Sequence, residues 1–177
     1  MILWTIQHIS AFDKMKITGV LRANEKYIDS DFKKSYNWIA KQMSKRIGKP
    51  PKSVKYPVWA WYQFEGKRKR PDMRFHARHW AEKGTPIVLM TIDVPDKLVL
   101  LSDFDYWNVV LSNGEIIFPF DESAVYSQKE KEKSWENIFD ITCSFTGEEK
   151  HKSITTQATI WEIKNEWVKK VEYFICR

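Results

Sequence analysis

Two tryptophans stand just before the densest cluster of positive charge in the chain. Residues 58–64 read VWAWYQF, and their alternation predicts a strand with Trp59, Trp61 and Gln63 on one face. The basic run Lys67–Arg70 follows at once. Aromatic rings beside cations can stack on a base and neutralise its phosphate. A strand buried on both faces, with the tryptophans in the core, would give the same pattern, so both interpretations stay open.

Charge is distributed unevenly along the chain. The net charge is +6, but the segment from Lys41 to Trp80 alone contains twelve basic and two acidic residues. This asymmetry favours an anionic partner such as nucleic acid, which would bind near the middle of the chain. A basic face that only contacts solvent is the alternative interpretation.

Length and composition indicate one soluble domain spanning residues 1–177. The chain is 43% hydrophobic, which is enough for a substantial core, yet no apolar run approaches the roughly 18 residues of a membrane span. The N-terminus lacks the features of a signal peptide, and only two cysteines occur, Cys143 and Cys176. We therefore expect a cytoplasmic protein with no membrane association and no metal.

Four segments have the apolar patterns of strands, and helical signals separate them. We expect an α+β fold with a mixed or antiparallel sheet. Its expected strands are Ile2–Gln7, Val58–Phe64, Ile87–Val94 and Thr155–Ile163.

Residues 31–47 repeat apolar side chains at helical spacing and predict an amphipathic helix that packs on this sheet. Its expected buried stripe is Phe32, Tyr36, Ile39 and Met43. Further along, residues 134–140 predict a helical turn packed by Trp135 and Phe139.

Asp103 and Asp105 flank Phe104 at the expected start of another helix, residues 104–111. Two neighbouring carboxyl groups can act as acid and base. Capping of the helix by Ser102 or Asp103 is the alternative role, and the sequence does not decide between them.

Several blocks of residues resemble the uncharacterised bacterial family of domains of unknown function DUF3841. The resemblance covers nearly the whole chain but implies no established activity. The blocks are Trp59-Ala60-Trp61-Tyr62, Pro71-Asp72-Met73-Arg74, Leu101-Ser102-Asp103-Phe104-Asp105-Tyr106-Trp107 and Gln157-Ala158-Thr159-Ile160-Trp161-Glu162.

The order of the elements also resembles the ADP-ribosyltransferase superfamily. That resemblance implies NAD as cofactor, Glu162 as the catalytic carboxylate and Gln157 as the residue that orients it. The chain departs from the superfamily pattern because Thr159 replaces the glutamate of a Gln-x-Glu motif. The expected cleft would lie between the first strand and the strand Thr155–Ile163, and would be lined by Trp4, Gln7, Arg22, Trp59, Trp61, Tyr62 and Arg74.

Three functions follow from these patterns. The first is an NAD-dependent transferase that acts on nucleic acid or a nucleotide. The second is a non-catalytic RNA- or DNA-binding module that uses Trp59 and Trp61 with Lys67, Arg68, Lys69 and Arg70. The third is a component of a toxin–antitoxin or phage-conflict system regulated by a protein partner. Whether the protein is an enzyme stays open at this point.

Overall fold

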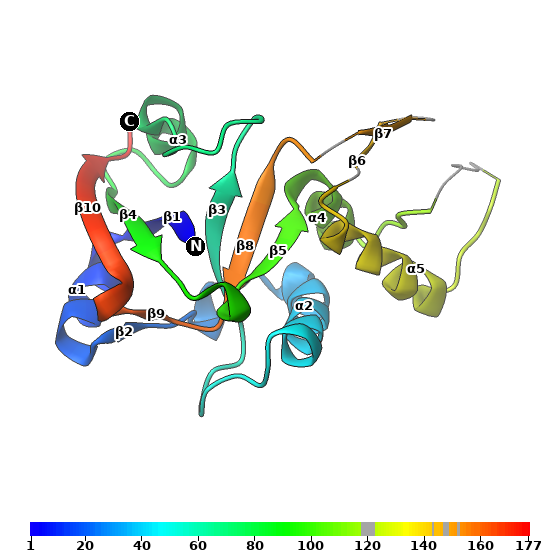
Figure 1. The fold of residues 1–177 in the computed structure, drawn as a ribbon, viewed down its shortest axis with the longest axis horizontal. Coiled ribbons are helices and arrows are strands. Elements are labelled where there is room, and N and C mark those ends of the chain that lie inside the picture. Colours follow the sequence, from blue (N-terminus) through cyan, green and yellow to red (C-terminus); the bar gives the residue numbers. More distant parts are fainter. Residues whose placement is uncertain (118–122, 143, 147–148, 152) are drawn as a thin grey trace.

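The computed structural model describes residues 1–117, 123–142, 144–146, 149–151 and 153–177 (Figure 1). Six strands form the central sheet in the order β10-β4-β1-β3-β8-β5, and every neighbouring pair is antiparallel. The expected α+β class is confirmed, and the sheet is antiparallel rather than mixed. Its strands are β1 (Ile2–His8), β3 (Val58–Gln63), β4 (Pro86–Asp93), β5 (Leu100–Asp103), β8 (Thr156–Ile160) and β10 (Val168–Ile175).

Helices cover both faces and one edge of this sheet. They are α1 (Ile9–Thr18), α2 (Lys33–Arg46), α3 (Met73–His79), α4 (Phe104–Leu111) and α5 (Gln128–Ser134). In Figure 1, α3 lies beside the C-terminus, whereas α2, α4 and α5 gather near β5. Five 3-10 turns join these elements: η1 (Glu25–Tyr27), η2 (Ser30–Phe32), η3 (Asp96–Leu98), η4 (Trp135–Phe139) and η5 (Asn165–Trp167).

Two small sheets complete the described fold. β2 (Val20–Leu21) pairs with β9 (Ile163–Lys164), and β6 (Ser144–Thr146) pairs with β7 (Glu149–His151). β2 follows α1 directly, because Gly19 adopts the left-handed conformation (φ 76°) that ends this helix and turns the chain.

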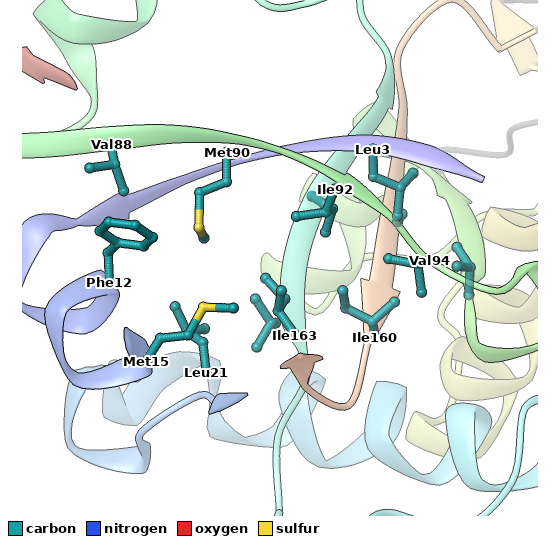
Figure 2. Packing of buried hydrophobic residues seen from close by; sticks show 14 residues of the cluster. Leu3, Phe12, Met15, Leu21, Val88, Met90, Ile92, Val94, Ile160 and Ile163 are labelled. Atoms are coloured by element: carbon teal, nitrogen blue, oxygen red, sulfur yellow. The ribbon is translucent and has the colours of Figure 1, made fainter. Parts of the chain in front are cut away.

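Strand β4 is buried on both faces, which explains its nearly continuous apolar sequence. Val88 and Met90 point toward Phe12 and Met15 of α1, in the core cluster that Figure 2 shows. Ile87 and Leu89 point to the opposite face, where they join a second cluster that includes Met73 and Ala77 of α3. Burial on both sides holds α1 and α3 against opposite faces of one strand.

The helix expected at Asp31–Ile47 begins two residues later than predicted. Ser30–Phe32 form the 3-10 turn η2, because the Asp29 side chain accepts a hydrogen bond from the Asp31 backbone N–H at 3.0 Å. Phe32 is therefore 39% exposed and does not join a buried stripe. The side chains that α2 buries are Ser35, Trp38, Ile39, Gln42 and Met43, and its apolar side chains pack with α4, η4 and Leu100 of β5.

The strand expected at Thr155–Ile163 is divided between two sheets. β8 ends at Ile160, and β9 starts at Ile163 and pairs with β2 instead. Trp161 lies at the break, where its indole N–H donates to the carbonyl of Gly48 at 2.9 Å. The chain leaves the central sheet at this residue, because Trp161 is buried among side chains of α2, α4 and η4. We call this group of buried side chains the helical cluster.

Candidate functional site

Three of the expected cleft residues lie side by side on neighbouring strands. Trp4 of β1 is paired with Trp61 of β3, which is paired in turn with Gln157 of β8. Trp4 and Gln157 are buried, at 8% and 5% exposure, and Trp61 is half-buried. Trp59 shares this face by alternation, but its ring packs against Tyr36 and Trp107 at centroid distances of 6.1 and 4.8 Å. Trp59 is thus part of the boundary with the helical cluster.

Aromatic rings from the end of the β3 segment, from α3 and from α4 surround Trp61. The ring centroids of Phe64, His76 and Phe104 lie 5.3, 5.9 and 5.1 Å from that of Trp61. His76 comes from α3 and is 9% exposed. None of these three residues was predicted from the sequence as part of the site. The available signal for His76 is its position on the short helix α3, which does not by itself predict a role in a site.

Buried polar atoms without partners gather on the same part of the fold. Within the described residues, no hydrogen-bond partner is present for the amide nitrogen of Gln157, the hydroxyl of Ser102 or Nε2 of His76. Ser102 and Gln157 are paired across β5 and β8, so their side chains are neighbours. The same holds for one carboxylate oxygen of Asp103. Buried polar groups nearly always have partners, so these atoms are available to a bound molecule or water.

Asp103 caps helix α4, which was one of its two expected roles. Its other carboxylate oxygen accepts the backbone N–H of Tyr106 at 2.9 Å, and the side chain is 1% exposed. Burial, together with the neighbouring charge of Asp103, raises the pKa of Asp105. The two carboxyl groups therefore have different environments: Asp103 is fully buried in a cap, whereas Asp105 is only partly desolvated and remains open to solvent.

We expect His76 to make the protein less stable in acid. Burial lowers the pKa of His76, His79 adds to this effect, and the carboxylates of Asp72 and Glu65 oppose it. The unfolded chain therefore binds the proton first as the pH falls below about 6.5, and the free energy of unfolding decreases from there toward the lower folded pKa. Urea unfolding between pH 7.5 and 5 should show this loss, and His76→Phe should reduce it. Identical pH profiles for the wild type and this variant would contradict the expectation, and the surface variant His79→Gln is the matched control.

The loop after β3 is a tight hairpin turn. Glu65 and Gly66 both have positive φ, 47° and 72°, and Phe64 forms a bridge with Lys67. Two consecutive positive φ values are typical of the turn that joins strands without disturbing their twist. The turn brings the basic run back over the sheet.

All four residues of the run Lys67–Arg70 are exposed, as predicted, but the arginines and lysines differ in their contacts. The guanidinium of Arg68 lies over the ring of Tyr62, 4.0 Å from its centroid, and donates to the carbonyl of Ile2. Arg70 forms an ion pair with Glu172 of β10 at 2.8 Å. The two arginines attach the loop to the sheet, which leaves Lys67 and Lys69 to project from it.

Two hollows flank the loop after this run. The smaller hollow, of about 250 Å³, is lined by Phe64, Glu65, Lys67, Lys69, Arg70, Pro71, Asp72, Phe75 and His76. The larger hollow, of about 1410 Å³, extends along α3 to the ends of β4 and β10. Its cations are Lys69, Arg70, Arg74, Lys83 and Arg177, and Asp72 is its one carboxylate side chain. Both hollows therefore combine aromatic or apolar walls with positive charge.

The remaining cleft residues lie elsewhere. Glu162 follows the end of β8 opposite Gln157 and forms an ion pair with Arg22 at 2.8 Å. Gln7 donates to the hydroxyl of Thr5 at 2.8 Å, on the face opposite Trp4. Arg74 is exposed and pairs with Asp72 at 2.6 Å, and this guanidinium keeps the pKa of Asp72 well below its usual range.

The expected adjacency of the first strand and the Thr155–Ile163 strand is not found. β3 lies between β1 and β8. Gln157 and Glu162 lie five residues apart, so they occupy opposite faces of a regular strand and could face one cleft only if a bulge lay between them. The irregularity in the β3–β8 pairing falls instead between Trp61 and Gln63 of β3. These two residues therefore do not meet.

The described part of the chain offers neither a membrane-spanning helix nor a cluster of metal ligands. No helix there is both long and apolar enough to cross a membrane. Likewise, the described residues contain no group of three or more His, Cys, Asp or Glu side chains arranged for a metal ion.

Three of the four sequence blocks that resemble DUF3841 lie within the residues that the family model matches, whereas the block at residues 157–162 lies outside them. The model of a domain of unknown function, DUF3841, matches residues 2–128. The chain belongs to the DUF3841 family. The matched segment contains β1, β3, the basic loop, α3 and β5, and thus most of the residues around Trp61. No curated protein matches the chain.

Proposed function

We propose that this DUF3841 protein binds single-stranded nucleic acid at the surface formed by the basic loop, α3 and the two hollows. The observation that carries this proposal is the pair of hollows, which share Lys69 and Arg70 and are each lined by more cationic than acidic side chains. Positive grooves attract the phosphate backbone, and adjacent aromatic rings stack on bases. We call this area the α3 surface below.

Exposed aromatic rings distinguish the α3 surface from a simple basic face. Phe75 and Trp80 are 55% and 40% exposed, and both lie on or just after α3. Large aromatic rings are costly to leave in water, and a duplex keeps its bases stacked away from such side chains. Rings beside cations therefore favour unpaired bases over duplex.

Binding accounts for the geometry better than NAD-dependent transfer. The transferase interpretation requires Glu162 beside the tryptophans and a phosphate-binding arginine. Instead, Glu162 is paired with Arg22, and it follows the end of β8 opposite the end at which Gln157 pairs with Trp61. The two arginines of the expected cleft are both paired with carboxylates, Arg22 with Glu162 and Arg74 with Asp72.

The test is a comparison of single-stranded and duplex oligonucleotides of the same sequence, as RNA and as DNA. Fluorescence anisotropy at low salt should show binding of the single strands at least several times tighter than that of the duplexes, because only unpaired bases can stack on the exposed rings. Equal or tighter binding of the duplexes, or no binding of either, would contradict the proposal.

A further inference from the structure

The smaller hollow has three aromatic walls from two segments of the chain. Phe64 comes from the end of the β3 segment, and Phe75 and His76 come from α3. The ring centroids of Phe64 and Phe75 lie 4.9 and 5.4 Å from that of His76, at interplanar angles of 69° and 88°. The three rings therefore line the hollow edge-to-face rather than filling it with one stack.

One polar atom within these walls lacks a partner. Nε2 of His76 is buried and has no hydrogen-bond partner among the described residues, although its side chain lines the hollow. Burial lowers the pKa of His76, so the ring is neutral near pH 7. A neutral imidazole nitrogen can donate or accept one hydrogen bond, which suits the edge of a base better than a phosphate.

The rim of the hollow is charged, in contrast to its aromatic walls. Lys67, Lys69 and Arg70 line it together with Glu65 and Asp72. A ligand that suits both parts is a flat aromatic ring joined to an anionic group. The volume of about 250 Å³ is below the roughly 300–1,000 Å³ of pockets that hold drug-sized ligands. It therefore suits one base rather than a dinucleotide.

We propose that the smaller hollow receives one unpaired base of the bound strand, with the base ring against Phe75 and its hydrogen-bonding edge toward Nε2 of His76. The adjacent phosphates then lie at Lys67 and Lys69. This inference rests on the proposed function, since it names the part of the strand that the α3 surface would recognise.

Oligonucleotides that contain 2-aminopurine separate base insertion from strand binding. Anisotropy of a labelled end reports binding of the strand, whereas fluorescence of 2-aminopurine falls when the base stacks on an aromatic ring. We expect the wild type to quench the probe several-fold in a single-stranded 12-mer. Phe75→Leu, which removes the ring from an exposed position, should abolish most of this quenching and weaken binding by about 5- to 100-fold.

Tyr27→Leu is the matched control, because Tyr27 is also an exposed aromatic residue but lies in η1 and lines neither hollow. This variant should retain the quenching. His76→Phe keeps an aromatic wall and removes the polar atom, and it should reduce the differences in affinity among adenine, cytosine and thymine homopolymers. Strand binding without quenching, or equal quenching by the wild type and Phe75→Leu, would overturn the base pocket and leave the proposed function standing. Absence of strand binding by the wild type would overturn both.

Discussion

Replacement of Trp135 by alanine is expected to destabilise the protein by about 3–5 kcal/mol, as is usual for a buried aromatic residue. Trp135 is fully buried, and its ring packs edge-to-face on Trp38 with centroids 5.4 Å apart. Its indole N–H also donates to the carbonyl of Gly114 at 2.6 Å, so the variant leaves that carbonyl without its indole donor. The loss is a large part of the roughly 5–15 kcal/mol that stabilises a typical domain.

Urea and thermal unfolding measure this effect. We expect the melting temperature to fall by roughly 6–20 °C, at about 2–4 °C per kcal/mol for a domain of this size. Trp80→Ala is the control, since Trp80 is 40% exposed and its removal should cost less than about 1 kcal/mol. Equal destabilisation by the two variants would show that the cluster around Trp135 does not hold the helices as the structure indicates.

Removal of three lysines from the α3 surface is expected to weaken binding of single-stranded nucleic acid by about 10- to 100-fold. Lys67, Lys69 and Lys83 are exposed and line the hollows. Each contact between an exposed lysine and a phosphate contributes about 0.5–1 kcal/mol, and the three together give this range. The triple alanine variant should retain its fold, because no described side chain forms an ion pair with any of the three within the structure.

The matched control removes the same charge from elsewhere on the surface. Lys49, Lys52 and Lys97 are exposed and line neither hollow. Anisotropy titrations at 100 mM salt should show little change for their triple alanine variant. If both triple variants lose affinity equally, binding depends on net charge alone, and the α3 surface has no special role.

Local sequence patterns predicted individual helices and strands well, because the spacing of apolar residues reflects which faces of each element are buried. The alternation in residues 58–63 reflects one strand with two different faces, and the apolar run at residues 87–92 reflects burial on both faces of β4. The helical turn packed by Trp135 and Phe139 was also confirmed, since both join the helical cluster.

The order of the strands could not be predicted from such patterns. Pairing depends on contacts between residues far apart in the sequence, and alternation does not say which strand lies beside which. The expected cleft therefore placed β8 next to β1, although β3 separates them. Trp4, Trp61 and Gln157 still lie side by side, because they occupy paired positions on the same face of β1, β3 and β8, which are neighbours in the sheet.

The roles of the charged residues also depended on tertiary contacts. In the sequence, the four cations of the basic run are equivalent. In the structure, Arg70 forms an ion pair with Glu172, which lies 102 residues away in the sequence. Glu162 finds Arg22 in the same way, at a separation of 140 residues. His76 showed no sequence signal beyond its place on a short helix, and its orientation toward the hollow depends on how α3 packs on the sheet.

The salt dependence of binding shows whether the lysines of the α3 surface contact the phosphates of the strand. Each phosphate neutralised on a single strand contributes about −0.7 to the slope of log K against log salt. We predict a slope of about −3 or steeper for the wild type with a single-stranded oligonucleotide. The variant lacking Lys67, Lys69 and Lys83 should have a slope shallower by about 2. The Lys49, Lys52 and Lys97 variant should remain parallel to the wild type. Parallel slopes for the wild type and the α3-surface variant would contradict binding at the α3 surface, because the strand would then bind elsewhere on the protein.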